Sequence, residues 1–137
     1  MRKQNASSIF IAILCLMAIL PAGCGKKKDY KTYRNLSWEG TELTISLGAN
    51  RSSGCTWTTK SQDDRIIDYS INRVFHLNTT SEGAVGILDA GFEGKGAGTT
   101  QILCTTPVGW DGTGEGYTYT VTVTVNANGT IQSATGE

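Results

Sequence analysis

The sequence has little of what membrane-spanning proteins and nucleic-acid-binding proteins need. Its longest apolar run, residues 9–20, has 12 residues, whereas a membrane-spanning helix needs about 20. Lysine plus arginine number 12 and aspartate plus glutamate number 12, so the formal net charge is zero. A balanced charge gives no reason to expect a nucleic-acid partner or an acidic substrate. We therefore expect a single small domain that binds no nucleic acid.

The start of the chain has the features of an export signal. Arg2 and Lys3 precede the apolar run, and a run of this length suits the hydrophobic core of a signal peptide. We therefore expect a signal peptide over residues 1–23. Export would carry the remaining chain into a compartment where disulfides persist.

The apolar run ends in Leu-Pro-Ala-Gly-Cys, residues 20–24. This segment resembles the lipobox of bacterial lipoproteins, in which the cysteine is lipidated and becomes the new N-terminus. Pro21 departs from the usual pattern, which has leucine at the third position before the cysteine. The resemblance implies a lipidated Cys24, anchoring to the bacterial cell membrane, and a tether over residues 24–39. Cleavage of a plain secretory signal nearby is the alternative.

The chain is also poor in groups for catalysis and metal binding. It has one histidine, His76, and of its four cysteines only Cys55 and Cys104 remain after the signal peptide and the lipid-bearing Cys24. Two cysteines left in one small exported domain most simply pair with each other. We therefore expect a Cys55–Cys104 disulfide, and no enzyme, cofactor or metal site.

The pattern of residues 40–137 predicts an all-β fold. Polar and apolar residues alternate in the way typical of strands, and this predicts strands at residues 42–47, 55–59, 98–105 and 117–125. Shorter apolar groups at 66–67 and 74–77 indicate further strands, and Asn128-Gly129 predicts a hairpin turn near the end. Glycine-rich stretches at 83–98 and 109–116 are expected to be loops. Short strands separated by turns favour an immunoglobulin-like β-sandwich.

Residues 50–57 read Asn-Arg-Ser-Ser-Gly-Cys-Thr-Trp. This stretch resembles the Asn-Pro-Thr-Thr-Gly-Tyr-x-Trp motif of the chagasin-type inhibitors of papain-like cysteine peptidases. Asn50, Gly54 and Trp57 are identical to the motif. Two serines, Ser52 and Ser53, stand where the family has threonines. Cys55 stands at the aromatic position.

Two further landmarks of this family follow in order. The family's second landmark is a glycine-rich segment followed by a phenylalanine and by a strand that begins with Gly-Thr. This chain has Gly83-Ala-Val-Gly86, then Phe92, then Gly98-Thr99-Thr100, in the same order. The third landmark, Arg-Pro-Trp, corresponds to Val108-Gly109-Trp110, where only the tryptophan is kept. The resemblance covers about residues 40–126. Loss of the arginine and proline predicts weaker affinity or a different target.

The resemblance implies a reversible, noncovalent inhibitor that wedges three loops into the peptidase cleft, at about residues 50–55, 83–94 and 107–112. The implied peptidase-binding residues are Asn50, Ser52, Ser53, Gly54, Gly83, Gly86, Val108 and Trp110, and Trp57 is implied to be a core residue. The expected partners are a papain-like cysteine peptidase and, through the lipid anchor, the membrane, and we expect a monomer. A non-inhibitory immunoglobulin-like binding or adhesion module of a cell-surface lipoprotein is the alternative.

Trp110 is expected to be the main apolar anchor of this surface. It is flanked by Gly109 and by Asp111-Gly112, a segment too flexible and polar for a buried strand. The indole is therefore expected at the tip of a loop. A ring folded back as a lid over the end of the sandwich is the alternative.

Overall fold

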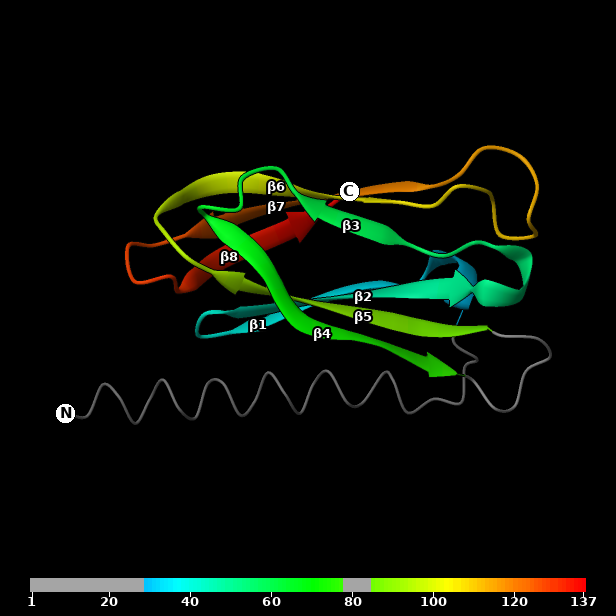
Figure 1. Cartoon of the computed structure of the whole chain (residues 1–137), viewed down its shortest axis with the longest axis horizontal. Coiled ribbons are helices and arrows are strands. Elements are labelled where there is room, and N and C mark those ends of the chain that lie inside the picture. Colours follow the sequence, from blue (N-terminus) through cyan, green and yellow to red (C-terminus); the bar gives the residue numbers. More distant parts are fainter. Residues whose placement is uncertain (1–28, 78–84) are drawn as a thin grey trace.

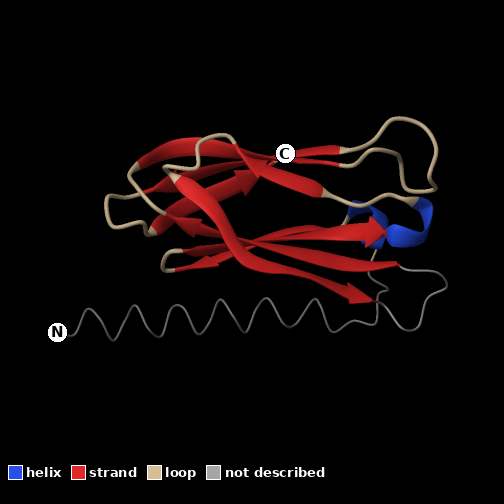
Figure 2. Ribbon diagram, viewed as in Figure 1, coloured by secondary structure: helices blue, strands red, loops and turns tan. Residues whose placement is uncertain are grey.

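The computed structural model describes residues 29–77 and 85–137, which form a sandwich of two antiparallel β-sheets (Figures 1 and 2). One sheet has the strand order β1-β2-β5-β4 and the other β3-β6-β7-β8. The strands are β1 (Arg34–Glu39), β2 (Glu42–Asn50), β3 (Thr58–Ser61), β4 (Ile67–Leu77), β5 (Val85–Gly94), β6 (Gly98–Thr105), β7 (Thr118–Val125) and β8 (Ile131–Gly136). The predicted all-β sandwich is confirmed. Within the described ranges, no helix is long and apolar enough to cross a bilayer.

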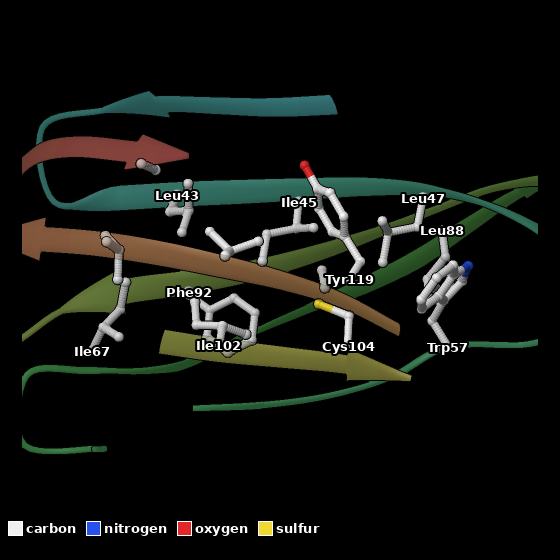
Figure 3. Close-up of a cluster of buried hydrophobic side chains, with 14 of the residues drawn as sticks. Leu43, Ile45, Leu47, Trp57, Ile67, Leu88, Phe92, Ile102, Cys104 and Tyr119 are labelled. Carbon is white, nitrogen blue, oxygen red and sulfur yellow. The ribbon is translucent and has the colours of Figure 1, made fainter. Parts of the chain in front are cut away.

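The core lies between the two sheets, where alternating side chains of both meet (Figure 3). Successive side chains of a strand point to opposite faces, so β7 buries Tyr119, Val121, Val123 and Val125 and turns its threonines outward. From the facing sheet, Ile45 and Phe92 are completely buried. Apolar burial of this kind contributes roughly 25 cal/mol for each Å² removed from water. The alternation in the sequence therefore fixes which face of each strand enters the core.

Residues 85–94 were expected to be part of a glycine-rich binding loop, and this is wrong. They form β5, which pairs with β2 on one side and with β4 on the other. Leu88, Ala90 and Phe92 are buried at alternate positions, which is the period of a strand. The glycines serve close packing, because a Cβ on Gly94 would lie 2.1 Å from the carbonyl oxygen of Gly129.

The sandwich also begins earlier than expected. β1 lies inside the segment predicted to be a tether, and it pairs with β2 from Arg34 opposite Leu47 to Glu39 opposite Glu42. Before it lies a short 3-10 helix, η1 (Tyr30–Thr32). Alternation of Leu36 with Trp38 is too short a pattern to separate a strand from a linker in the sequence, whereas the pairing with β2 makes the assignment clear.

The two ends of the sandwich differ in their connections (Figure 1). At one end, here called the loop end, residues 51–57 join β2 to β3 and residues 106–117 join β6 to β7. The β2–β3 connection begins with a 3-10 helix, η2 (Arg51–Ser53). At the opposite end, here called the turn end, the connections are shorter: residues 40–41, 62–66, 95–97 and 126–130.

Candidate functional site

The β2–β3 connection forms a closed loop at the loop end. The main chains of Asn50 and Cys55 exchange two hydrogen bonds, with N–H···O distances of 2.9 and 3.0 Å. Between them, Gly54 ends η2 in the left-handed conformation, with φ of 89°. A side chain at that φ is strained, so the glycine is required by the turn. The loop therefore presents a compact turn rather than an extended segment.

Hydrogen bonds tie this first loop to the β6–β7 connection. The carbonyl oxygen of Trp110 accepts one hydrogen bond from Asn50 Nδ2 at 3.0 Å and another from Ser53 Oγ at 2.7 Å. Ser52 Oγ donates to Asn50 Oδ1 at 2.8 Å, which orients the amide so that its nitrogen faces Trp110. Residues from two separate sequence motifs therefore form one surface.

The β6–β7 connection is also held together internally. The main-chain N–H of Trp110 donates to the hydroxyl of Tyr117 at 3.0 Å, and Gly109 N–H donates to the carbonyl of Thr113 at 3.1 Å. The side chain and main chain of Thr113 donate to Asp111 Oδ1, and these hydrogen bonds lower the pKa of Asp111. A turn with this many local partners is held in one conformation before anything binds it.

The packing of the two loops is close. A Cβ on Gly112 would lie 2.8 Å from the carbonyl oxygen of Ser53. A Cβ on Gly54 would lie 3.7 Å from Val108 Cγ2. The first distance is too short for a side chain at position 112, so Gly112 allows the main chains of the two loops to approach one another, whereas the second is an ordinary van der Waals contact.

Trp110 was expected to hold its indole out at the loop tip, but its side chain is partly buried. Among the described residues, the exposed large apolar side chains lie elsewhere: Trp38, Tyr69, Val74 and Leu103. The hydrogen bonds between the loops use the main chain of Trp110 and leave its indole outside that network. The ring is thus neither fully extended nor fully covered.

The base of the loop end is a group of aromatic rings around Arg34. Its guanidinium carbon lies 4.7 Å from the ring centroid of Trp57 and 5.9 Å from that of Tyr117. Burial lowers the pKa of Arg34. Trp57 is 1% exposed, and its Nε1 donates to the carbonyl of Gly48 at 2.8 Å. The implied core role of Trp57 is confirmed.

Sequence reasoning missed Arg34 and Tyr117, which support the third loop from below. Tyr117 holds the main chain of Trp110, and Arg34 packs over the ring of Tyr117. The register of Arg34 with the buried Leu47 places Arg34 on the core-facing side of β1. No sufficient signal for this position was present in the sequence, because the alternation of Leu36 with Trp38 is too short to identify β1.

Arg51 is a second residue that sequence reasoning missed. It is exposed, and its guanidinium carbon lies 4.9 Å from the ring centroid of Phe75. Both residues line a hollow of about 480 Å³ together with Ala49, Thr56 and Leu88. In the resemblance, Arg51 stands at the position of the family's proline, so the first loop gains a cation that the family motif lacks.

Not all the predicted binding residues come together. Asn50, Ser52, Ser53, Gly54, Val108 and Trp110 meet at the loop end. Gly86 is buried inside β5, opposite Ala49 and Leu77. It is therefore not part of an exposed loop that could contact a partner. Gly83 lies outside the described residues, as does Cys24.

The predicted Cys55–Cys104 disulfide is absent, and both cysteines are buried free thiols. β3 lies beside β6, but Cys104 stands opposite Thr59. Cys55 precedes Thr59 by four residues, whereas a disulfide needs Cα atoms within roughly 7 Å. Burial raises the pKa of the Cys104 thiol to about 12, and it also raises the pKa of Cys55.

One further polar cluster lies on the outer face of the first sheet. Asp89 accepts a hydrogen bond from Ser46 Oγ at 2.6 Å and contacts His76 Nε2 at 2.8 Å. A catalytic triad needs the histidine between the serine and the carboxylate, whereas here the carboxylate stands between the other two. These three residues therefore do not form a triad. In the part of the chain that the structure describes, no group of His, Cys, Asp and Glu could hold a metal ion.

No family model, curated protein or solved structure matches this chain. A function for this chain is therefore inferred from the geometry of the loop end and from the resemblance of its motifs.

Proposed function

We propose that this chain is a reversible, noncovalent inhibitor of papain-like cysteine peptidases that inserts its loop end into the active-site cleft. The observation that carries the proposal is the pair of hydrogen bonds from Asn50 and Ser53 to the carbonyl of Trp110. Through them, two stretches that resemble separate inhibitor motifs form one continuous surface. The contact residues are Asn50, Ser52, Ser53, Gly54, Val108 and Trp110, with Arg51 added.

The strand order supports an immunoglobulin-like form of the sandwich. Immunoglobulin constant domains have strands in the orders A-B-E-D and C-F-G. The orders β1-β2-β5-β4 and β3-β6-β7 correspond to these in chain order, and β8 extends the second sheet. The antibody hallmark disulfide has no counterpart, because β2 carries no cysteine opposite Cys104. In this fold the loops at one end of the sandwich are the usual binding surface.

The geometry of the loops suits inhibition without cleavage. A peptidase cleaves a segment that lies extended along its cleft, whereas the first loop is a closed turn with Gly54 at its bend. Its main chain is tied to the β6–β7 connection before any partner arrives. Loops that are ordered in advance lose less conformational entropy on binding, which favours affinity.

Arg51 and Trp110 are the side chains proposed to make the strongest contacts. Arginine and tryptophan are enriched among the residues that dominate binding energy at interfaces. Arg51 is exposed and Trp110 is partly buried, so both present surface at the loop end. The cation of Arg51 in the first loop offers a charged contact where the third loop lacks the family's arginine.

The proposal includes export and lipidation at Cys24, which the pattern of residues 20–24 supports. Mass spectrometry of the membrane fraction is expected to find a lipid-modified N-terminal cysteine at this position. An unmodified N-terminus elsewhere would overturn the anchor but would leave the proposed inhibition unaffected.

Inhibition is tested with the chain from Cys24 to Glu137 and a papain-like cysteine peptidase. We expect competitive inhibition, recovery of the chain at its full mass, and binding to a peptidase variant whose catalytic cysteine is replaced by alanine. A serine peptidase serves as the control and should not be inhibited. Absence of inhibition, or steady cleavage of the chain, would overturn the proposal and favour a non-inhibitory binding module.

A further inference from the structure

The described chain starts beside the two binding loops. The main chain of η1 packs against β2 so closely that a Cβ on Gly48 would lie 1.7 Å from the carbonyl oxygen of Tyr30. The N–H of Gly48 donates to the carbonyl of Tyr33 at 3.0 Å. Gly48 precedes Asn50 by two residues. The segment before the sandwich is therefore fixed at the loop end (Figure 1).

The same segment also lies near the third loop. Besides the hydrogen bonds from Thr113, the positive charge of Lys31 in η1 contributes to the lowered pKa of Asp111. The guanidinium of Arg34, two residues after η1, lies over the rings of Trp57 and Tyr117. The start of the domain thus touches the supports of both loops rather than the turn end.

The tether to a lipid at Cys24 would be short. Five residue steps separate Cys24 from Asp29, and a fully extended chain covers at most about 3.4 Å per residue, or roughly 17 Å. A peptidase domain of about 200 residues has a radius of gyration of roughly 16 Å and is about 40 Å across. The distance from the bilayer to the loop end would therefore be smaller than the width of the peptidase that must bind at the loop end.

We propose that the lipid anchor regulates the inhibitor by holding its loop end against the membrane, so that inhibition is full only when the chain is released or its tether lengthened. This inference rests on the proposed function. The turn end, with Trp38, would then face away from the membrane. The bilayer acts as a competitor for the space in front of the loops.

The test attaches the chain from Cys24 to Glu137 to phosphatidylcholine vesicles that carry a maleimide lipid. Coupling is directed to Cys24 because Cys55 and Cys104 are completely buried and their pKa values are raised. A matched variant carries about 20 Gly/Ser residues between Lys28 and Asp29, which add a root-mean-square span of roughly 25 Å. The inhibition constant for a papain-like peptidase is measured for both vesicle-bound chains and for the free chain.

We expect the vesicle-bound chain to inhibit at least tenfold more weakly than the free chain, and the lengthened variant to inhibit within about threefold of it. Equal inhibition by all three forms would overturn the masking by the membrane. Equally weak inhibition by both vesicle-bound forms would also overturn it, because tether length would then not matter. A free chain that does not inhibit would instead overturn the proposed function, and the regulation with it.

The orientation can be measured without any peptidase. Energy transfer from tryptophan to dansyl-labelled lipid is compared for vesicle-bound Trp38→Phe and Trp110→Phe chains. We expect more transfer in Trp38→Phe, because its remaining tryptophans, Trp57 and Trp110, both lie towards the loop end. More transfer in Trp110→Phe would show the turn end nearer the bilayer and would overturn the inference.

Discussion

The two ends of the sandwich are stabilised in different ways. At the turn end, distant segments are joined by main-chain hydrogen bonds, such as that from the N–H of Ile131 to the carbonyl of Gly40 at 2.8 Å. The side chain of Asn126 bonds only within its own turn, where Oδ1 accepts from the main-chain N–H groups of Asn128 and Thr130, each at 2.9 Å. At the loop end, Asn50 and Trp110 are 60 positions apart in the chain when they meet. At the loop end, side chains of Asn50 and Ser53 therefore join the two loops, whereas at the turn end main-chain hydrogen bonds join the distant segments.

The largest effect that separates the two ends is expected from their tryptophans. Trp57→Ala should lower the free energy of unfolding by about 3–5 kcal/mol, because it removes a completely packed indole beneath the loops. Trp38 is 41% exposed at the turn end, so Trp38→Ala should change stability by less than about 1 kcal/mol. Chemical denaturation of both variants checks this. Equal losses would contradict the assignment of Trp57 to the core.

A pair of asparagines tests the hydrogen bonds at each end. Asn50 donates through Nδ2, so Asn50→Asp removes the donor and places an anion near the carbonyl of Trp110. We expect a loss of about 1–3 kcal/mol of stability. Asn126 only accepts through Oδ1, so Asn126→Asp should be nearly neutral. Thermal midpoints of the two variants check this. A larger decrease of the midpoint in Asn126→Asp than in Asn50→Asp would contradict the hydrogen bond between the two loops.

The buried thiol of Cys104 predicts a dependence of stability on pH. Burial raises its pKa in the folded chain to about 12, above the usual value near 8.5 of an unfolded chain. The unfolded state therefore loses this proton first, and stability should fall as the pH rises from about 9 towards 12. Denaturation curves under reducing conditions should show a shallower fall for Cys104→Ala, in which Tyr119 still contributes in the same direction. An identical fall in both chains would refute the role of Cys104.

The smallest effect is expected at the exposed ion pair of the turn end. Arg65 Nε lies 3.1 Å from Asp63 Oδ1, with the arginine side chain 86% exposed. Exposed pairs of this kind are screened by water and salt. Arg65→Ala should therefore leave both the thermal midpoint and the inhibition constant unchanged within error. A clear drop in inhibition would place part of the binding surface at the turn end.

Local sequence patterns predicted most of the strands, because polar and apolar residues already alternate within short stretches such as residues 118–125. Glycine content misled the prediction for β5. There the buried Leu88, Ala90 and Phe92 outweigh the flexible glycines, and Gly94 provides room for the chain beside Gly129. Turn chemistry at Asn128-Gly129 was readable for the same local reason, and Gly129 has a φ of 83°.

The parts of the site that depend on register could not be read from the sequence. The hydrogen bond between Asn50 and the carbonyl of Trp110 requires two loops to meet across the sandwich. The position of Cys104 opposite Thr59 depends on how β3 and β6 align, which composition does not determine. The order of the family motifs could indicate which loops come together, but not which atoms bond.

The most direct measurement of the proposed inhibition uses the two tryptophans at opposite ends. In Trp110→Ala the main-chain N–H and carbonyl that tie the loops remain, so only the indole is lost. Loss of an interface anchor of this kind costs about 2 kcal/mol or more, which is roughly a thirtyfold rise in the inhibition constant against a papain-like cysteine peptidase. Trp38→Ala should inhibit as the unaltered chain does. Equal inhibition by both variants, or a loss confined to Trp38→Ala, would contradict binding through the loop end.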